Sequence, residues 1–156
     1  MSTMTQTSGA GTYLDTFSDL EQRTQGQPEW LRSLRREAFA SFCDAGFPTI
    51  KDEAWRFTSV APIAQTVFSL PEAKPSGVSR ADVDPFRIEG TACSLVFVNG
   101  RFAPELSDQP KLAAGVYAGS LGEALAADTG ALELQLDLKL ALQNDAFSSL
   151  NTAFIE

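Results

Sequence analysis

The chain has 156 residues, of which 44% are hydrophobic, so it is long and apolar enough for one folded domain with a buried core. Its formal net charge of −8 argues against nucleic acid as a partner, because binding to phosphates requires clustered lysines and arginines. The sequence contains no histidine, which excludes imidazole bases, Ser–His and Cys–His nucleophile pairs and histidine-containing zinc sites within these residues.

The beginning of the sequence predicts a tail followed by a helix. Residues 1–11 read MSTMTQTSGAG, a small polar stretch without periodicity, and we expect them to form a disordered tail. Leu14, Phe17 and Leu20 then recur at helical spacing. A first helix is therefore expected to begin near Thr12 and to end before the polar run that precedes the next apolar pattern.

The stretch EWLRSLRREAFASFCDAG carries the clearest helical pattern of the sequence. Pro28 suits the first turn of this helix, and Gly46 is placed to end it as a C-terminal cap. The apolar residues form one stripe, made of Trp30, Leu34, Ala38 and Phe42 with Leu31 and Cys43 beside it. Three arginines lie between them: Arg32, Arg35 and Arg36. They have two interpretations, a solvated face balanced by Glu29 and Glu37 or a docking patch for an acidic partner.

The segment FPTIKDEAWRFTS at 47–59 mixes charged and aromatic side chains. Thr49 is placed to cap a short helix by accepting a backbone hydrogen bond. Asp52 and Glu53 then fall in the first turn, where the helix dipole favours negative charge. The local pattern therefore predicts a short capped helix at this point of the chain.

The two aromatic residues of this segment are expected to hold it in place. We expect Trp55 and Phe57 to be buried between the helical region and the start of a sheet, so that truncating either to alanine costs on the order of 3–5 kcal/mol. An exposed ion pair of Asp52 or Arg56 would contribute only about 0–1 kcal/mol. The charged side chains then anchor the preceding loop or face another part of a larger assembly.

Prolines and glycine punctuate residues 61–85, which predicts a loop-like connection. We place a boundary here, with a helical region at 12–86 and a mixed α/β segment at 87–156. Within the second part, an apolar run at 95–98 is followed by Asn99-Gly100, a dipeptide that suits a type I′ turn, so a β-hairpin is expected.

The remaining elements are short, and one of them is ambiguous. A strand at 115–118 and a small helix capped by Ser120 are expected after the hairpin. In ALELQLDLKLAL, leucines occupy every even position of 132–142, which is strand periodicity, although these residue types favour helices. Both assignments stay open. The final stretch DAFSSLNTAFIE resumes helical spacing. The fold class expected is α+β.

No motif for catalysis or for cofactor binding stands out. Asp52 and Glu53 are adjacent and would diverge on a helix, and Asp82 and Asp84 lie at a proline turn that does not favour a metal. Cys43 and Cys93 lie fifty positions apart, without a CxxC spacing or a disulfide framework. We therefore expect no catalytic residue, no metal site, no cofactor site and no enzyme activity in these residues.

The sequence also lacks signals for a membrane. No run approaches the roughly 18 apolar residues of a transmembrane helix, and the first residues do not have the charged and apolar regions of a signal peptide. No membrane partner is expected, and the expected location is cytoplasmic.

Three separated stretches resemble the N-terminal part of the SufB/SufD family, and its SufD branch in particular. They are PTIKDEAWRFTS at 48–59, LVFVNGRFAPELS at 95–107 and DAFSSLNTAF at 145–154. The motif residues that we expect to serve a structural or interface role are Asp52, Glu53, Trp55, Arg56, Phe57, Asn99, Gly100, Leu150 and Asn151.

The resemblance implies a function that composition does not reveal. Proteins of this family are subunits of the SUF iron–sulfur cluster assembly scaffold, in which SufD-like and SufB-like chains pair through a right-handed β-helix and bind SufC-like ATPases. The family's cluster ligands and ATPase-binding surface lie downstream of residue 156, so no position here inherits them. The resemblance implies an N-terminal fragment, in which a hairpin and short helices lead into a truncated β-helix.

A second hypothesis comes from a different class of protein. The chain could be a stand-alone acidic protein–protein binding module, in which a hairpin edge or a helix face docks a partner. An exposed strand such as 94–98 is an aggregation liability unless it is covered or paired. This interpretation and the scaffold interpretation differ in whether the chain acts without a β-helix.

Overall fold

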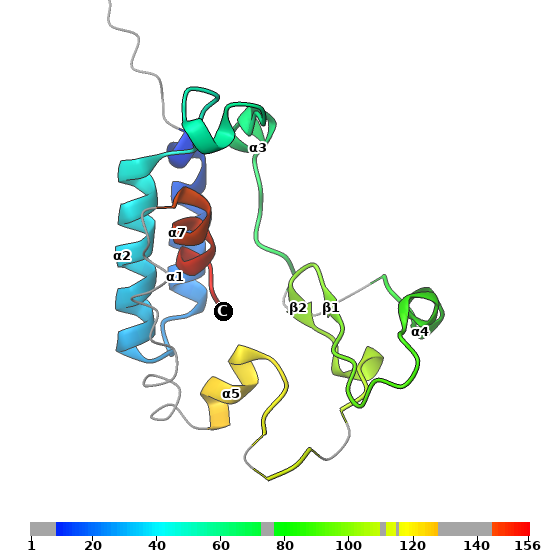
Figure 1. Ribbon diagram of the computed structural model, residues 1–156. Helices are drawn as coiled ribbons and strands as arrows, with labels where there is room; N and C mark the ends of the chain where they lie inside the picture. The colour runs from blue at the N-terminus through cyan, green and yellow to red at the C-terminus, as the bar shows by residue number, and fades with distance from the viewer. Residues whose placement is uncertain (1–8, 73–76, 110–111, 115, 128–144) are drawn as a thin grey trace, which may run out of the picture. The chain divides into compact units, whose positions relative to one another are not determined.

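The computed structural model describes residues 9–72, 77–109, 112–114, 116–127 and 145–156 (Figure 1). The chain divides into two compact units. The first comprises Met1–Leu70 and Thr129–Glu156, and the second comprises Pro71–Asp128. The predicted three-part division of the sequence stays a prediction. In the structure, the C-terminal helix belongs to the same unit as the N-terminal helices.

The first unit is helical. Its elements are η1 (Gly9–Tyr13), α1 (Leu14–Arg23), α2 (Glu29–Ala45), η2 (Glu53–Trp55), α3 (Ala61–Gln65) and α7 (Ala146–Ala153). The two helices expected from the sequence are confirmed as α1 and α2. Pro28 directly precedes α2, and Gly46 ends it with a φ of 66° while its N–H donates to the Phe42 carbonyl at 2.8 Å.

Helix α7 lies along α2, as Figure 1 shows. The buried residues of α7 are small: Ala146, Ser149, Thr152 and Ala153. On α2 they meet a fully buried Ala38, and the hydroxyl oxygens of Ser41 and Ser149 lie 3.3 Å apart. Small side chains let the two helices approach closely. The helical spacing expected for this stretch is confirmed by α7.

An aromatic cluster forms the core between these helices. The rings of Phe17 and Phe39 stack in parallel with their centroids 4.1 Å apart. Phe154 packs edge-on against Tyr13, Phe17 and Phe39, at 6.2, 5.9 and 6.5 Å between centroids. Ring contacts of this kind contribute about 0.5–1.5 kcal/mol beyond the burial of their area. Phe154 therefore ties the end of α7 to both α1 and α2.

The second unit contains short elements around a hairpin. They are α4 (Arg80–Val83), η3 (Asp84–Phe86), β1 (Phe97–Val98), β2 (Arg101–Phe102), η4 (Pro104–Leu106) and α5 (Leu121–Ala127). The predicted hairpin is confirmed, with β1 and β2 antiparallel and Val98 paired with Arg101. Asn99 and Gly100 have φ values of 50° and 78°, the positive values that a type I′ turn requires.

Several expectations need correction or lie outside the described residues. The stretch at 61–85 is not only a loop, because it holds α3 and α4 and begins η3. No strand forms at 116–118, and residues 115 and 132–142 lie outside the described residues. Residues 9–11, which were expected to belong to a disordered tail, lie in η1. Ser120 caps α5 as expected, accepting from the Glu123 N–H at 3.1 Å.

The class of the fold is α+β, mostly helical with one small antiparallel sheet in the ranges described. The β-helix that the family resemblance implies does not occur among these residues. None of the helices in the described ranges has the length and hydropathy that crossing a bilayer requires.

Candidate functional site

The segment around Asp52 forms a self-contained turn. The Asp52 carboxylate accepts hydrogen bonds from the backbone N–H of Thr49 at 2.6 Å and from its hydroxyl at 3.1 Å. These bonds lower the pKa of Asp52 below its ordinary value, because they stabilise the ionised form. The Thr49 hydroxyl also accepts from the Lys51 N–H at 3.2 Å within this turn, but Thr49 does not cap the helix as expected, because the N-cap residue of η2 is Asp52. The helix that follows is a single 3-10 turn, η2, which begins at Glu53.

Trp55 connects this turn to the C-terminal helix. Its side chain is partly buried, and its ring centroid lies 5.3 Å from that of Phe147 on α7. The Phe147 ring in turn lies 5.6 Å from Phe47. The expectation that Trp55 packs against the start of the sheet is wrong. The structure instead places it against a helix of the first unit.

The expectation that Phe57 is buried is wrong. Phe57 is 89% exposed, and the guanidinium of Arg56 lies 4.7 Å from the centre of its ring. Glu53 is exposed as well. Because Phe57 makes a cation–π contact rather than core packing, Trp55 and Phe47, and not Phe57, join the segment to α7 through ring contacts. Phe57 and Arg56 form an outward-facing pair.

The motif residues near the C-terminus serve the packing of α7. Asp145 caps this helix by accepting from the N–H groups of Phe147 and Ser148 at 3.4 and 3.0 Å. The Ser148 hydroxyl also donates to Asp145, at 2.7 Å. This bond is the largest cause of a lowered pKa of Asp145, and the two backbone bonds act in the same direction. Leu150 packs against the aromatic core, whereas Asn151 is exposed. This cap was not among the expected features, although an aspartate directly before a helical pattern is the usual signal for one.

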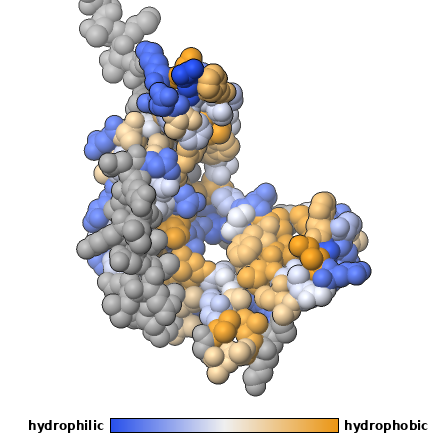
Figure 2. All heavy atoms as spheres, viewed as in Figure 1, coloured by the Kyte–Doolittle hydropathy of each residue, from blue (hydrophilic) through white to orange (hydrophobic). Residues whose placement is uncertain are grey.

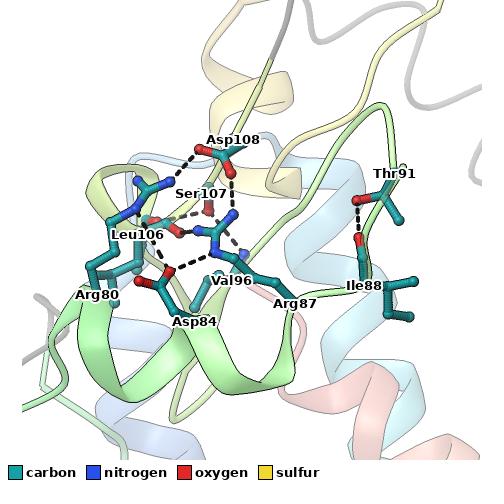
Figure 3. A network of polar contacts seen from close by, with 10 residues as sticks. Arg80, Asp84, Arg87, Ile88, Thr91, Val96, Leu106, Ser107 and Asp108 are labelled. Atoms are coloured by element: carbon teal, nitrogen blue, oxygen red, sulfur yellow. Dashed lines mark hydrogen bonds and ion pairs between the residues drawn. The ribbon is translucent and has the colours of Figure 1, made fainter.

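A network of charged side chains organises the second unit (Figure 3). Arg80 donates to Asp108 at 2.8 Å, and Arg87 donates to Asp84 at 3.1 Å and to the Leu106 carbonyl at 2.7 Å. Arg87 also pairs with Asp108. The hydrogen bond from Arg80 is the main cause of a lowered pKa of Asp108. The network joins α4 and η3 to the chain that returns after the hairpin.

Asp82 and Asp84, the two aspartates considered for a metal site, bind neighbouring residues of the second unit. Asp82 accepts from the backbone N–H and the hydroxyl of Ser79, at 2.9 and 2.6 Å, in a capping box at the start of α4. Asp84 belongs to the arginine network. Among the residues that the structure describes, no group of three or more histidine, cysteine, aspartate or glutamate side chains is arranged to hold a metal ion.

Arg35 is buried, so the three arginines of α2 do not all lie on a solvated face as one interpretation expected. Its side chain is 1% exposed, and its Nε donates to the Ile155 carbonyl at 2.7 Å, while Nη2 donates to the Gln27 side chain. Within the part of the chain that the structure describes, its Nη1 has no hydrogen-bond partner. Burial lowers the pKa of Arg35, and the charge of Glu156 acts in the opposite direction. Arg32 and Arg36 do pair with glutamates, as the solvated interpretation expects.

The comparisons with known proteins identify the family. The model of the SufBD protein N-terminal region matches residues 7–156, which is nearly the whole chain. The chain belongs to the SufB/SufD family. No curated protein and no solved structure gave a significant match.

Membership of the SufB/SufD family associates this chain with SUF iron–sulfur cluster assembly and with the partners of that system in general. Both cysteines of this SufB/SufD chain are free thiols, and each is partly buried. Burial raises the pKa of Cys43, which packs against the aromatic core.

Proposed function

We propose that this chain is the N-terminal portion of a SufD-like scaffold subunit in iron–sulfur cluster assembly, and that it acts through structure and protein contacts without catalysis of its own. The observation that carries the proposal is the family match over residues 7–156. The SufD branch is supported by the three stretches at 48–59, 95–107 and 145–154, which resemble that branch in order and spacing.

The geometry of these stretches supports a structural role. Trp55 from the first stretch contacts Phe147 from the third, so the two lie together in the first unit. Asn99 and Gly100 from the second stretch form the turn of the hairpin. The aspartates with a lowered pKa are held by capping hydrogen bonds or arginines, which leaves them ionised rather than poised for proton transfer.

The partners follow from the proposed role. For the full-length protein they are SufB-like and SufC-like subunits, in the cytoplasm, without nucleic acid or membrane. An antibody raised against residues 12–156 tests this in the source cells by immunoprecipitation and mass spectrometry. We expect a band of more than twice 16.8 kDa, accompanied by SufB-like and SufC-like chains. A band near the mass of this chain with neither subunit would overturn the proposal and favour a stand-alone acidic binding module.

The proposal also predicts that these residues bind no cluster. We expect anaerobic incubation with iron and sulfide to leave the chain without the visible absorbance of an iron–sulfur cluster. The variant with both Cys43→Ser and Cys93→Ser is the matched control, and it should give the same spectrum. A stoichiometric cluster that disappears in this variant would contradict a role without a cofactor.

A further inference from the structure

Asn99 and Gly100, at the tip of the hairpin, have the features that favour conversion of an asparagine to aspartate by water. Glycine has no Cβ that would hinder its own backbone nitrogen. Both residues are exposed, and a Cβ built on Gly100 would meet no atom within 4 Å. The Gly100 N–H has no hydrogen-bond partner among the residues described. The nitrogen that would attack the Asn99 side chain is therefore accessible.

The reaction needs only these two residues and water. The Gly100 nitrogen bonds to Cγ of Asn99 while the bond from Cγ to the side-chain nitrogen breaks, and that nitrogen leaves as ammonia with the proton of the Gly100 N–H. The product is a five-membered imide. Water then opens this ring. Cleavage at Cγ gives aspartate, and cleavage at the main-chain carbonyl carbon of Asn99 gives isoaspartate, in which the backbone runs through Cγ.

The type I′ turn holds Asn99 in a conformation that prevents ring closure. The φ of Asn99 is 50°, and ψ at this position of a type I′ turn is roughly +30°. At that ψ the Gly100 nitrogen lies nearly opposite Cβ across the Cα–C bond, so it does not reach Cγ. Closure needs a large rotation about this bond, which brings the nitrogen to the side of Cβ. The hairpin must therefore open before Asn99 reacts.

The hairpin is held by few contacts next to its turn. The ladder consists of two residue pairs, Phe97 with Phe102 and Val98 with Arg101. The two phenylalanine rings lie 5.4 Å apart between centroids. Phe97 is 48% exposed, and Figure 2 shows apolar side chains on the surface of the second unit. Because a two-stranded hairpin is only marginally stable by itself, its end opens more readily than a packed helix.

We propose that Asn99 is a site of non-enzymatic deamidation, and that opening of the hairpin at the pair of Phe97 and Phe102 sets its rate. This modification site goes beyond the proposed scaffold role. Its two products act differently on the fold. Asp-Gly also suits a type I′ turn, so aspartate keeps the hairpin and adds a negative charge at its tip. Isoaspartate inserts an extra carbon atom into the backbone of the turn, which disrupts the strand register.

The test incubates the whole chain at neutral pH and follows its tryptic peptides by mass spectrometry. Trypsin cuts after Arg87 and Arg101, so the peptide 88–101 contains Asn99 as its only asparagine. Electron-transfer fragmentation distinguishes isoaspartate from aspartate in this peptide. We expect both products to accumulate at Asn99.

Asn151 is the internal reference. It is exposed like Asn99, but it lies within α7 and precedes Thr152, whose branched Cβ hinders the backbone nitrogen. We expect Asn99 to convert faster than Asn151 by roughly tenfold or more, because the helix opens less often than the end of the hairpin.

Two comparisons test the dependence on hairpin opening. A synthetic peptide of residues 94–104 lacks the rest of the unit, so Asn99 should react several-fold faster in it than in the chain. Phe102→Ala removes the contact between the rings and should speed conversion of Asn99 by roughly two- to tenfold, without changing that of Asn151. Phe102→Tyr retains the ring and is the matched control, which should react at the wild-type rate.

The outcomes separate the two parts of the proposal. An Asn99 rate no higher than that of Asn151, or conversion to aspartate without isoaspartate, overturns the modification site. Equal rates in the chain and in the synthetic peptide overturn the dependence on opening, and so does a Phe102→Ala chain that reacts at the wild-type rate. If conversion of Asn151 also accelerates in Phe102→Ala, that variant has unfolded, and the comparison of the unaltered chain with the peptide decides.

Discussion

Replacing Trp55 with alanine distinguishes the two aromatic residues of the DEAWRFT segment. Trp55 is partly buried against Phe147, with ring centroids 5.3 Å apart, whereas Phe57 is 89% exposed. Truncating a fully buried tryptophan costs on the order of 3–5 kcal/mol. Because Trp55 keeps part of its exposure, we expect Trp55→Ala to lower the free energy of unfolding by about 2–3 kcal/mol. Phe57→Ala, the matched control, should change it by less than about 0.5 kcal/mol.

Thermal and urea unfolding measure both variants. For a chain of this length 1 kcal/mol shifts the melting temperature by about 2–4 °C, so Trp55→Ala should melt roughly 4–12 °C below the wild type. A double-mutant cycle with Phe147→Ala isolates the contact between the rings. We expect a coupling energy of about 0.5–1.5 kcal/mol, since the pair is tilted and close.

Two results would refute this reasoning. Equal melting temperatures for Trp55→Ala and Phe57→Ala would mean that the Trp55 side chain does not hold the segment. A coupling energy of zero with Phe147 would mean that the loss comes from another neighbour of Trp55, and that the segment is not joined to α7 through these rings.

Three further predictions concern caps, charges and turns, all measured by urea unfolding. Asp145→Ala should cost about 1 kcal/mol, because it removes the cap of α7, while Asp145→Asn retains most of the stability. Contact with Arg80 lowers the folded-state pKa of Asp108, so its stabilisation is present at pH 7 and is lost as the pH falls from about 4 through that lowered pKa. Asp108→Asn should therefore be less stable than the wild type at pH 7, and the difference should shrink as the pH falls below about 4. Parallel stability curves would contradict this. Gly100→Ala should cost about 1 kcal/mol because φ is 78°, whereas Gly26→Ala, which meets no atom within 4 Å and has no positive φ, should not destabilise.

The amino-acid sequence by itself determined the local elements. Helices α1 and α2 follow from apolar residues at helical spacing and from Pro28 and Gly46 at the ends of α2. The type I′ hairpin follows from Asn99-Gly100 between apolar runs. These features depend on backbone geometry and hydrogen bonds within a few residues, so periodicity and turn chemistry are enough to predict them.

The tertiary structure alone decided which faces meet. Arg35 looked like one of three solvated arginines, yet it is buried because the Ile155 carbonyl, 120 positions later, accepts its Nε–H. Trp55 and Phe57 looked equivalent, yet only Trp55 meets an aromatic ring of α7. Burial depends on contacts between segments far apart in the chain, and the alternation of residue types in one segment carries no information about the partner that covers it.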